Sequence, residues 1–282
     1  MPISTKNVSG AVNQQETSLV SKFFYYTGFC VGELSCSVIR ANDKRGRGFY
    51  FMPDITISNA DLNLLKEINQ IVSPNLGNIS PIKGGYNLKF RGKRKAEKVF
   101  QFFQSYPVIT GDLARRKLEL LKNILPAIGG NSKVPDREKV IEKCREELKD
   151  LKLNGLAEEI EDISNFTDDQ KGFFLAGIVD AEGSCGFKKS GLRLQPFFAV
   201  AMKDRKIIEL IKDFLNCGNI HVRTNDGLYH WETNKISDIR KVTEIFMTRY
   251  PCKLTKMKDR MKNLRRTLND YTPRPRKGGE MI

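Results

Sequence analysis

The stretch Phe174-Leu-Ala-Gly-Ile-Val-Asp-Ala-Glu-Gly-Ser184 decides the fold of this chain, because an earlier stretch repeats its pattern. The earlier stretch reads Tyr25-Tyr-Thr-Gly-Phe-Cys-Val-Gly-Glu-Leu-Ser35. Each is an apolar run that predicts a helix with a glutamate near its end. The two stretches share a glycine, a glutamate and a serine in register: Gly28 and Gly177, Glu33 and Glu182, and Ser35 and Ser184.

The repeat continues beyond these two stretches, with a period of about 143 residues. Asn75-Leu-Gly-Asn-Ile79 matches Asn216-Cys-Gly-Asn-Ile220, and Tyr106-Pro107 matches Tyr250-Pro251. Each of these pairs follows a stretch with helical periodicity. Because the matches occur in the same order in both halves, the sequence predicts two homologous structural repeats in one chain.

Each half predicts the same series of elements, which identifies the fold class as α+β. An apolar helix comes first, followed by paired alternating strands, a helix, two further strands and a final helix. Helices then cover one face of an antiparallel, saddle-like sheet, and the other face is left open. The predicted strands lie at 37–40, 49–51, 86–90, 197–200 and 227–233, and the predicted helices at 61–71, 136–152 and 204–215.

Charge and composition set the domain boundaries that we expect. Residues 136–169 carry twelve acidic and six basic side chains, a net charge of −6, so the rest of the chain carries +21 and the basic charge is confined to the two repeats. Pro126 to Pro135 contains Gly129-Gly130 and indicates a flexible break. The predicted segments are an N-terminal tail (1–21), a first repeat (22–112), a linker with helices (113–170), a second repeat (171–268) and a basic C-terminal tail (269–282).

The excess of basic residues favours a polyanionic partner such as DNA or RNA. The chain has six cysteines without a C-x-x-C pair and two histidines, which argues against zinc fingers, zinc deaminases and histidine-centred nucleases. No apolar run reaches the length of a membrane span, so we expect no membrane partner. The N-terminal segment shows no targeting signal, which predicts an intracellular protein or one made inside an organelle.

Leu175-Ala-Gly-Ile-Val-Asp-Ala-Glu-Gly183 resembles the LAGLIDADG motif, and Tyr26-Thr-Gly-Phe-Cys-Val-Gly-Glu-Leu34 resembles a degenerate copy of it. The chain is therefore similar to the single-chain, two-motif homing endonucleases over roughly residues 22–266. The resemblance implies a metal-dependent nuclease whose two motif helices pack together at the repeat interface. Small residues four positions apart permit that approach: Gly28 and Gly32, and Gly177 and Ala181.

The resemblance also assigns the catalytic centre. Glu33 and Glu182 would meet at the base of the helix pair and bind metal there, together with Gly32 and Ala181. The implied cofactor is Mg²⁺, for which Mn²⁺ would substitute, whereas Ca²⁺ would bind without supporting cleavage.

Lys256 is the implied catalytic lysine, with Lys253 as an alternative. Asp112 is at the aligned place in the first half, and the first motif has Val31 and Leu34 where the family has an acid and a glycine. These departures predict a weaker first half.

Side chains that alternate along the predicted strands can reach base edges in the major groove. The partner implied is double-stranded DNA with a long asymmetric site. The predicted DNA-binding residues are Arg40, Lys44, Arg45, Arg47, Lys89, Arg91, Lys93, Lys188, Lys189, Arg193, Gln195, Arg223 and His230.

The leading functional prediction is an intron-encoded endonuclease that acts as a monomer, because duplication within one chain replaces dimer symmetry. Such a protein would work in a mitochondrion or chloroplast if its intron lies there. Two alternatives remain open: an RNA maturase that assists splicing of its host intron, and a nuclease-inactive DNA-binding regulator of the same fold.

Overall fold

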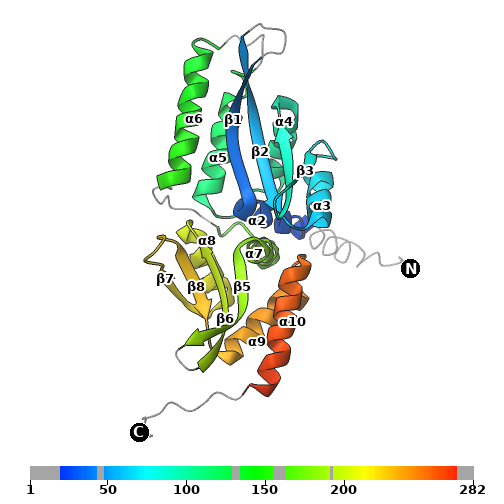
Figure 1. The fold of residues 1–282 in the computed structure, drawn as a ribbon, viewed down its shortest axis with the longest axis vertical. Helices are drawn as coiled ribbons and strands as arrows, with labels where there is room; N and C mark the ends of the chain where they lie inside the picture. Colours follow the sequence, from blue (N-terminus) through cyan, green and yellow to red (C-terminus); the bar gives the residue numbers. More distant parts are fainter. Residues whose placement is uncertain (1–19, 43–47, 129–133, 155–162, 191–192, 272–282) are drawn as a thin grey trace, which may run out of the picture.

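The computed structural model describes residues 20–42, 48–128, 134–154, 163–190 and 193–271. Two similar halves are stacked on either side of a central pair of helices, α2 and α7 (Figure 1). Each half contains a four-stranded antiparallel sheet with helices packed against it. The predicted α+β class and the pseudo-symmetric duplication are confirmed.

The first half begins with α2 (Phe24–Glu33), which passes directly into strand β1. Its sheet has the order β1-β2-β4-β3, and helices α3 and α4 pack on β2 and β4. The remaining elements are β1 (Leu34–Asn42), β2 (Phe49–Asn59), α3 (Leu62–Val72), β3 (Asn78–Ile82), β4 (Gly85–Arg91) and α4 (Lys93–Ser105).

The segment 113–154, which the sequence placed in a linker, forms most of two helices that belong to the packing of the first half. α5 (Asp112–Ile124) and α6 (Arg137–Asn154) contact each other and strand β1. Leu118, Leu121, Ile141 and Leu148 are buried between them and the sheet. The first half is therefore larger than the predicted repeat.

The second half repeats the order from α7 onward, with the sheet order β5-β6-β8-β7. Helices α8 and α9 pack on this sheet, and α10 packs on β5. A π-helical turn extends α9. The elements are α7 (Asp168–Glu182), β5 (Gly183–Ser190), β6 (Arg193–Met202), α8 (Arg205–Leu215), β7 (Asn219–Val222), β8 (Tyr229–Thr233), α9 (Ile236–Glu244), the π-turn η1 (Ile245–Arg249) and α10 (Thr255–Asp270).

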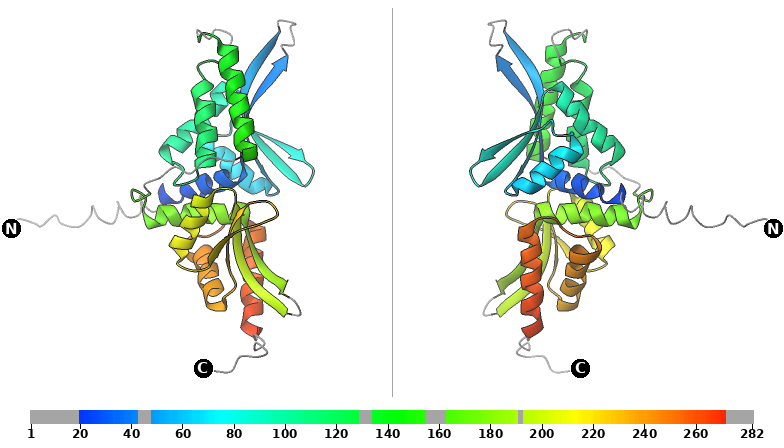
Figure 2. Two further views of the ribbon diagram at one scale, coloured as in Figure 1. Left: turned by 90° about the vertical axis from the view of Figure 1, so that its left-hand side faces the viewer. Right: turned by 90° about the vertical axis from the view of Figure 1, so that its right-hand side faces the viewer.

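Side-chain alternation gives each sheet two different faces. Ile55, Leu88 and Phe90 of the first sheet, and Phe198 and Trp231 of the second, are buried against helices. The opposite face, which we call the open face, carries polar residues. The strand hairpins project to one side of the molecule while α5, α8 and α9 lie on the other (Figure 2).

The central helices α2 and α7 approach each other backbone to backbone. A Cβ atom added to Gly28 would lie 1.9 Å from the carbonyl oxygen of Phe174, and one added to Gly177 would lie 2.1 Å from that of Tyr25. Any larger side chain at either glycine would separate the helices. Gly32 and Ala181 continue the contact, since a Cβ on Gly32 would lie 2.5 Å from the Cβ of Ala181.

Candidate active site

The helix pair ends with both motif glutamates at the junction of the two halves. Glu33 is the last residue of α2 and Glu182 the last residue of α7, and each sheet starts at the next residue. Leu34 (φ −79°) and Gly183 (φ −78°) both leave their helix in an extended conformation. Leu34 therefore needs no glycine-like backbone, and it is buried in the core without displacing Glu33 from the helix end.

The two carboxylates share an environment that disfavours two negative charges. Burial raises the pKa of Glu33, although a hydrogen bond from Asn59 opposes the shift. Burial and then repulsion from Glu33 raise the pKa of Glu182 to about 7. A cation between the carboxylates would remove the repulsion, so the pair fits a divalent metal ion.

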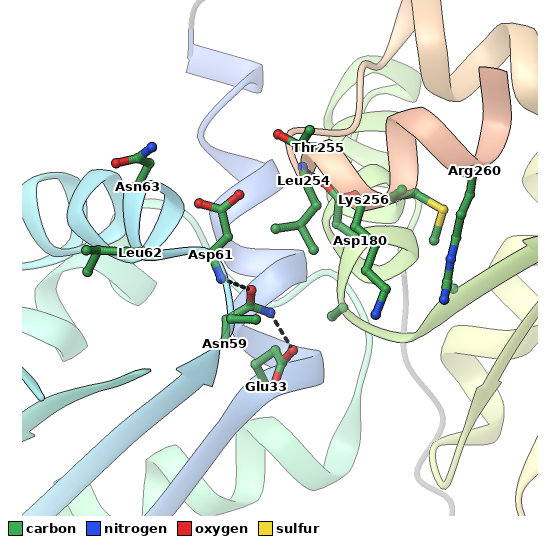
Figure 3. Close-up of a pocket in the computed structure, with 14 residues that line it drawn as sticks. Glu33, Asn59, Asp61, Leu62, Asn63, Asp180, Leu254, Thr255, Lys256 and Arg260 are labelled. Atoms are coloured by element: carbon green, nitrogen blue, oxygen red, sulfur yellow. Dashed lines mark hydrogen bonds between the residues drawn. The ribbon is translucent and has the colours of Figure 1, made fainter. Parts of the chain in front are cut away.

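Each glutamate opens into its own pocket. The Glu33 pocket is lined by Glu33, Asn59, Asp61, Asp180, Lys256 and Arg260, which come from both halves (Figure 3). The amide nitrogen of Asn59 donates a hydrogen bond to Oε1 of Glu33 at 3.0 Å. The amide oxygen of Asn59 accepts one from the backbone N–H of Asp61 at 2.9 Å. Asn59 is thus fixed by the start of α3 and in turn orients the carboxylate.

Asp180, the sixth residue of the second motif, fixes the loop that leads into α10. Its Oδ2 accepts hydrogen bonds from the Tyr25 hydroxyl (2.7 Å) and from the backbone N–H groups of Lys253 (2.5 Å) and Leu254 (3.0 Å). Lys256 follows this loop in the first turn of α10 and lines the Glu33 pocket. Asp180 therefore positions the predicted catalytic lysine.

Lys253, the alternative to Lys256, is occupied elsewhere. Its ammonium group donates to Oε1 of Glu67 at 2.6 Å and to the hydroxyl of Tyr26 at 2.7 Å, and it lies over the ring of Tyr26. These contacts tie the second half to α2 and α3 of the first. Lys253 joins the halves, whereas Lys256 reaches the pocket.

The Glu182 pocket is built from the equivalent elements but carries different side chains. It is lined by Glu182, Met202, Asp204, Leu113 and Lys117 among others. Lys117 is partly buried, and this desolvation lowers the pKa of its ammonium group. Within the described residues, the Glu182 carboxylate accepts no hydrogen bond.

Asp112, aligned with Lys256 by the Tyr-Pro pairs, does not take the place of that lysine. Its carboxylate pairs with the ammonium group of Lys206 at 2.8 Å. Leu113 lines the Glu182 pocket as Lys256 lines the other, because the loop between Tyr-Pro and the helix is one residue shorter in the second half. The π-turn η1, which directly precedes Tyr250, contains one residue more than the corresponding end of α4 in the first half.

The donor set suits Mg²⁺ in the presence of DNA. Within the described part of the chain, no three His, Cys, Asp or Glu side chains gather to hold a metal by themselves. Mg²⁺ is commonly bound by one or two carboxylates, with water and substrate phosphate as the other ligands. Glu33 and Glu182 would supply those carboxylates, and the backbone at Gly32 and Ala181 lies beside them.

Five predicted DNA-binding residues lie on the open faces, and three of them have partners there. Arg91 pairs with Asp54 at 3.2 Å, Lys188 pairs with Glu232, and His230 contacts His221 at 2.9 Å. The acids Asp54 and Glu232 were not predicted from the sequence. The five residues are Lys89 and Arg91 on the first sheet, and Lys188, Gln195 and His230 on the second.

The other predicted DNA-binding residues lie elsewhere. Alternation places Arg40 and Lys189 on the helix-facing sides of their strands, and the guanidinium of Arg40 stacks over the ring of Phe49 at 3.6 Å. Lys93 begins α4, and Arg223 pairs with Asp226 in the β7–β8 turn. Lys44, Arg45 and Arg47 lie outside the described residues, and Arg193 begins β6 with a side chain that the structure does not describe.

The sequence prediction missed Asn59, Lys117 and Arg260 as pocket residues. The sequence did contain a signal for Asn59. Asn59-Ala-Asp61 and Met202-Lys-Asp204 are one repeat period apart, and each stretch directly precedes a helix. Lys117 and Arg260 are likewise one helical turn beyond Leu113 and Lys256.

The raised pKa of Glu182 predicts a pH-dependent stability. Without metal, the folded state holds a proton on this carboxyl between about pH 4.5 and 7, where the unfolded chain has lost it. This site therefore destabilises the metal-free protein as pH rises through that window. In buffer with chelator, we expect Glu182→Gln to raise the melting temperature at pH 8 but not below pH 4.5.

Glu244→Gln is the matched control for this pH dependence, because Glu244 pairs with Arg265 at 2.6 Å on the surface. That variant should show no gain at pH 8. An equal gain from both variants would contradict a specific effect of the paired carboxylates.

Comparisons with known proteins agree with this architecture. A family model described as LAGLIDADG endonuclease matches residues 175–264, from the middle of α7 to the middle of α10. No curated protein sequence matches the chain.

Three solved structures are similar in fold. I-SmaMI bound to an uncleaved DNA target in the presence of calcium ions is 21% identical, with a TM-score of 0.70 over 88% of this chain and 92% of that one. I-SmaMI bound to cleaved DNA is 20% identical (TM-score 0.71; 88% of each chain), as is I-GzeII in complex with its DNA target (TM-score 0.67; 88% and 89%). Residues 175–264 of the chain are thus similar in sequence to the LAGLIDADG endonucleases, and both halves share the fold of I-SmaMI and I-GzeII.

Proposed function

We propose that this protein is a site-specific endonuclease that cuts both strands of a long, asymmetric DNA target with the help of Mg²⁺. The observation that carries the proposal is the pair of motif glutamates at the junction of the two sheets. Each carboxylate opens into a pocket lined by at least one basic side chain. A DNA phosphate in either pocket would lie near a carboxylate that can bind a metal ion and near a positively charged side chain.

The residues divide the chemistry between them. Glu33 and Glu182 would hold the divalent ion, which would supply Lewis-acid stabilisation of the phosphate when bound. Asn59 keeps the Glu33 carboxylate oriented, and Lys256 presents an ammonium group to the scissile phosphate. We expect Mn²⁺ to replace Mg²⁺, and Ca²⁺ to support binding without cleavage.

The open faces are the proposed DNA-binding surface. Lys89, Lys188, Gln195 and His230 occupy strand positions from which side chains can enter the major groove. The two faces carry different residues, so the two halves of the target should differ. One chain supplies both halves, which supports action as a monomer. No helix in the described part of the chain could cross a membrane.

The structural relatives support DNA as the partner. I-SmaMI and I-GzeII were solved with DNA, and they share the fold of this chain over both halves. An RNA maturase could use the same basic surface, but it would not require two carboxylates side by side. The paired glutamates therefore favour cleavage.

A selection for cleavage from a randomised double-stranded DNA library, in Mg²⁺, tests the proposal. We expect recovery of one long target with unlike halves. The same preparation should be assayed for binding and splicing of intron-containing RNA. Splicing without any DNA cleavage would favour the maturase, and DNA binding without cleavage would favour a nuclease-inactive regulator.

DNA binding should weaken steeply with salt, because basic side chains displace counterions from phosphates. The slope of log K against log salt should be roughly −0.9 for each phosphate contacted. Lys89→Gln on the open face should reduce the magnitude of this slope by about one, which corresponds to the loss of one phosphate contact. Lys139→Gln on α6, where the side chain is 82% exposed, is the matched control and should leave the slope unchanged. A slope near zero for the wild-type protein would contradict the proposed surface.

A further inference from the structure

The two pockets are related by the duplication, so their side chains can be compared pair by pair. Asn59 at the end of β2 corresponds to Met202 at the end of β6. Lys256 in the first turn of α10 corresponds to Leu113 in the first turn of α5, and Arg260 corresponds to Lys117 one turn later. The two pockets thus share a glutamate and a basic residue on the second turn of the following helix, but differ at Asn59/Met202 and at Lys256/Leu113.

The Glu33 pocket is held in place by polar contacts. Asn59 donates to the Glu33 carboxylate at 3.0 Å and is itself fixed by the backbone of Asp61. Asp180 holds the loop before α10 through two backbone N–H groups, which sets the position of Lys256. The Glu33 carboxylate is therefore preorganised in this pocket, and the backbone that carries Lys256 is fixed beside it.

Among the residues that the structure describes, the Glu182 pocket has neither a hydrogen-bond donor that orients its carboxylate nor a lysine at the start of its helix. The side chain of Met202 has no N–H or O–H group with which to orient Glu182, and Leu113 places an alkyl group where the other pocket has an ammonium group. Val31, the counterpart of Asp180, has no oxygen in its side chain to hold the loop before α5. The start of α5 is held instead by Asp204, whose Oδ2 accepts a hydrogen bond from the backbone N–H of Leu113 at 3.3 Å, and this contact fixes an alkyl side chain at the pocket. Lys203 also lines this pocket, but its ammonium group donates to the backbone carbonyl of Lys152 at 3.0 Å.

We propose that the Glu33 pocket cuts its DNA strand faster than the Glu182 pocket cuts the other, so that the enzyme nicks its target before breaking it. This inference rests on the proposed endonuclease function. In each pocket a water oxygen would bond to phosphorus as one bridging P–O bond breaks, and the leaving oxygen would gain a proton. The first motif, which the sequence predicted to be weaker, thus supplies the glutamate of the faster site.

The two strand rates within one protein molecule provide an internal comparison. The target recovered by selection is labelled at one end of each strand, and both rates are followed in Mg²⁺. For the wild-type protein we expect nicked DNA to accumulate before linear product, with strand rates that differ at least about tenfold. Asn59→Met should slow the faster strand, which assigns that strand to the Glu33 pocket.

The reverse substitution should repair the slower pocket. Met202→Asn combined with Leu113→Lys should raise the slower strand rate at least about tenfold and bring the ratio of the rates towards one. Binding of the same target in Ca²⁺, measured by fluorescence anisotropy, should change no more than a few-fold in either variant. A merely destabilising substitution would lower both strand rates together and leave their ratio unchanged.

Equal strand rates in the wild-type protein would overturn this inference while leaving the endonuclease proposal intact. So would slowing of the slower strand by Asn59→Met, because the pockets would then be assigned the wrong way round. Absence of cleavage of either strand, with selection yielding no target in Mg²⁺ or Mn²⁺, would overturn the endonuclease function and the strand preference together.

Discussion

Glu182→Gln is expected to eliminate the linear product from a plasmid that carries the target. Glutamine keeps the shape of the side chain but removes the charge that would hold a divalent ion beside Glu33. Loss of this metal contact, made where charge develops during phosphodiester hydrolysis, should lower the rate of double-strand breakage at least about a hundredfold. DNA affinity in Ca²⁺ should stay within a few-fold, because the proposed binding surface lies on the sheets.

The surface variant Glu244→Gln removes a carboxylate from the same half of the molecule without touching either pocket. It should cut at the wild-type rate, so the pair of variants separates a metal-binding role from a general effect of lost charge. If Glu182→Gln formed linear product in Mg²⁺ at close to the wild-type rate, the assignment of the catalytic centre would be wrong.

Gly177→Leu is expected to prevent correct folding. A Cβ at this position would lie 2.1 Å from the carbonyl oxygen of Tyr25 and 2.5 Å from the backbone nitrogen of Phe29. Both atoms are backbone, so neither can move aside without separating α2 from α7. The smaller change Gly177→Ala should already cost about 1–3 kcal/mol, which lowers the melting temperature by several degrees.

Gly84→Asn is the matched control for the loss of a glycine. Gly84 lies in the β3–β4 turn at φ +84°, and a Cβ there would meet no atom within 4 Å. Asparagine tolerates positive φ better than most residues, so this variant should melt close to the wild-type protein. An unchanged melting temperature for Gly177→Leu would show that the motif helices do not pack as described.

Much of the architecture follows from the sequence, because its signals are local or repeated. The small residues at positions 28, 32, 177 and 181 determine which faces of two helices can meet. The alternation along the strands determines which side chains face away from the helices. The duplicated glutamates then come to one place by symmetry, since equivalent residues of paired helices lie beside a common axis.

The differences between the pockets were decided by the tertiary structure. Sequence alignment at Tyr-Pro paired Lys256 with Asp112. The π-turn before Tyr250 adds one residue to the second half and the shorter loop after it removes one, so that Leu113 corresponds to Lys256. Arg40 and Lys189 fall on the helix-facing sides of their strands. A shift of one residue along a strand changes the face to which a side chain points, and the charge of the residue does not reveal that face.

The consequence of Leu34 and Asp180 also depended on packing. Sequence suggested that replacing the motif glycine by Leu34 would disturb Glu33, but the chain leaves both helices in an ordinary extended conformation. Glycine is needed at 183 for space, because a Cβ there would lie 2.3 Å from the carbonyl oxygen of Val179. Asp180 acts on residues more than seventy positions away. Local pattern thus determined the repeat, the helix pair and the acids, whereas contacts between distant segments determined which acid is supported by polar neighbours.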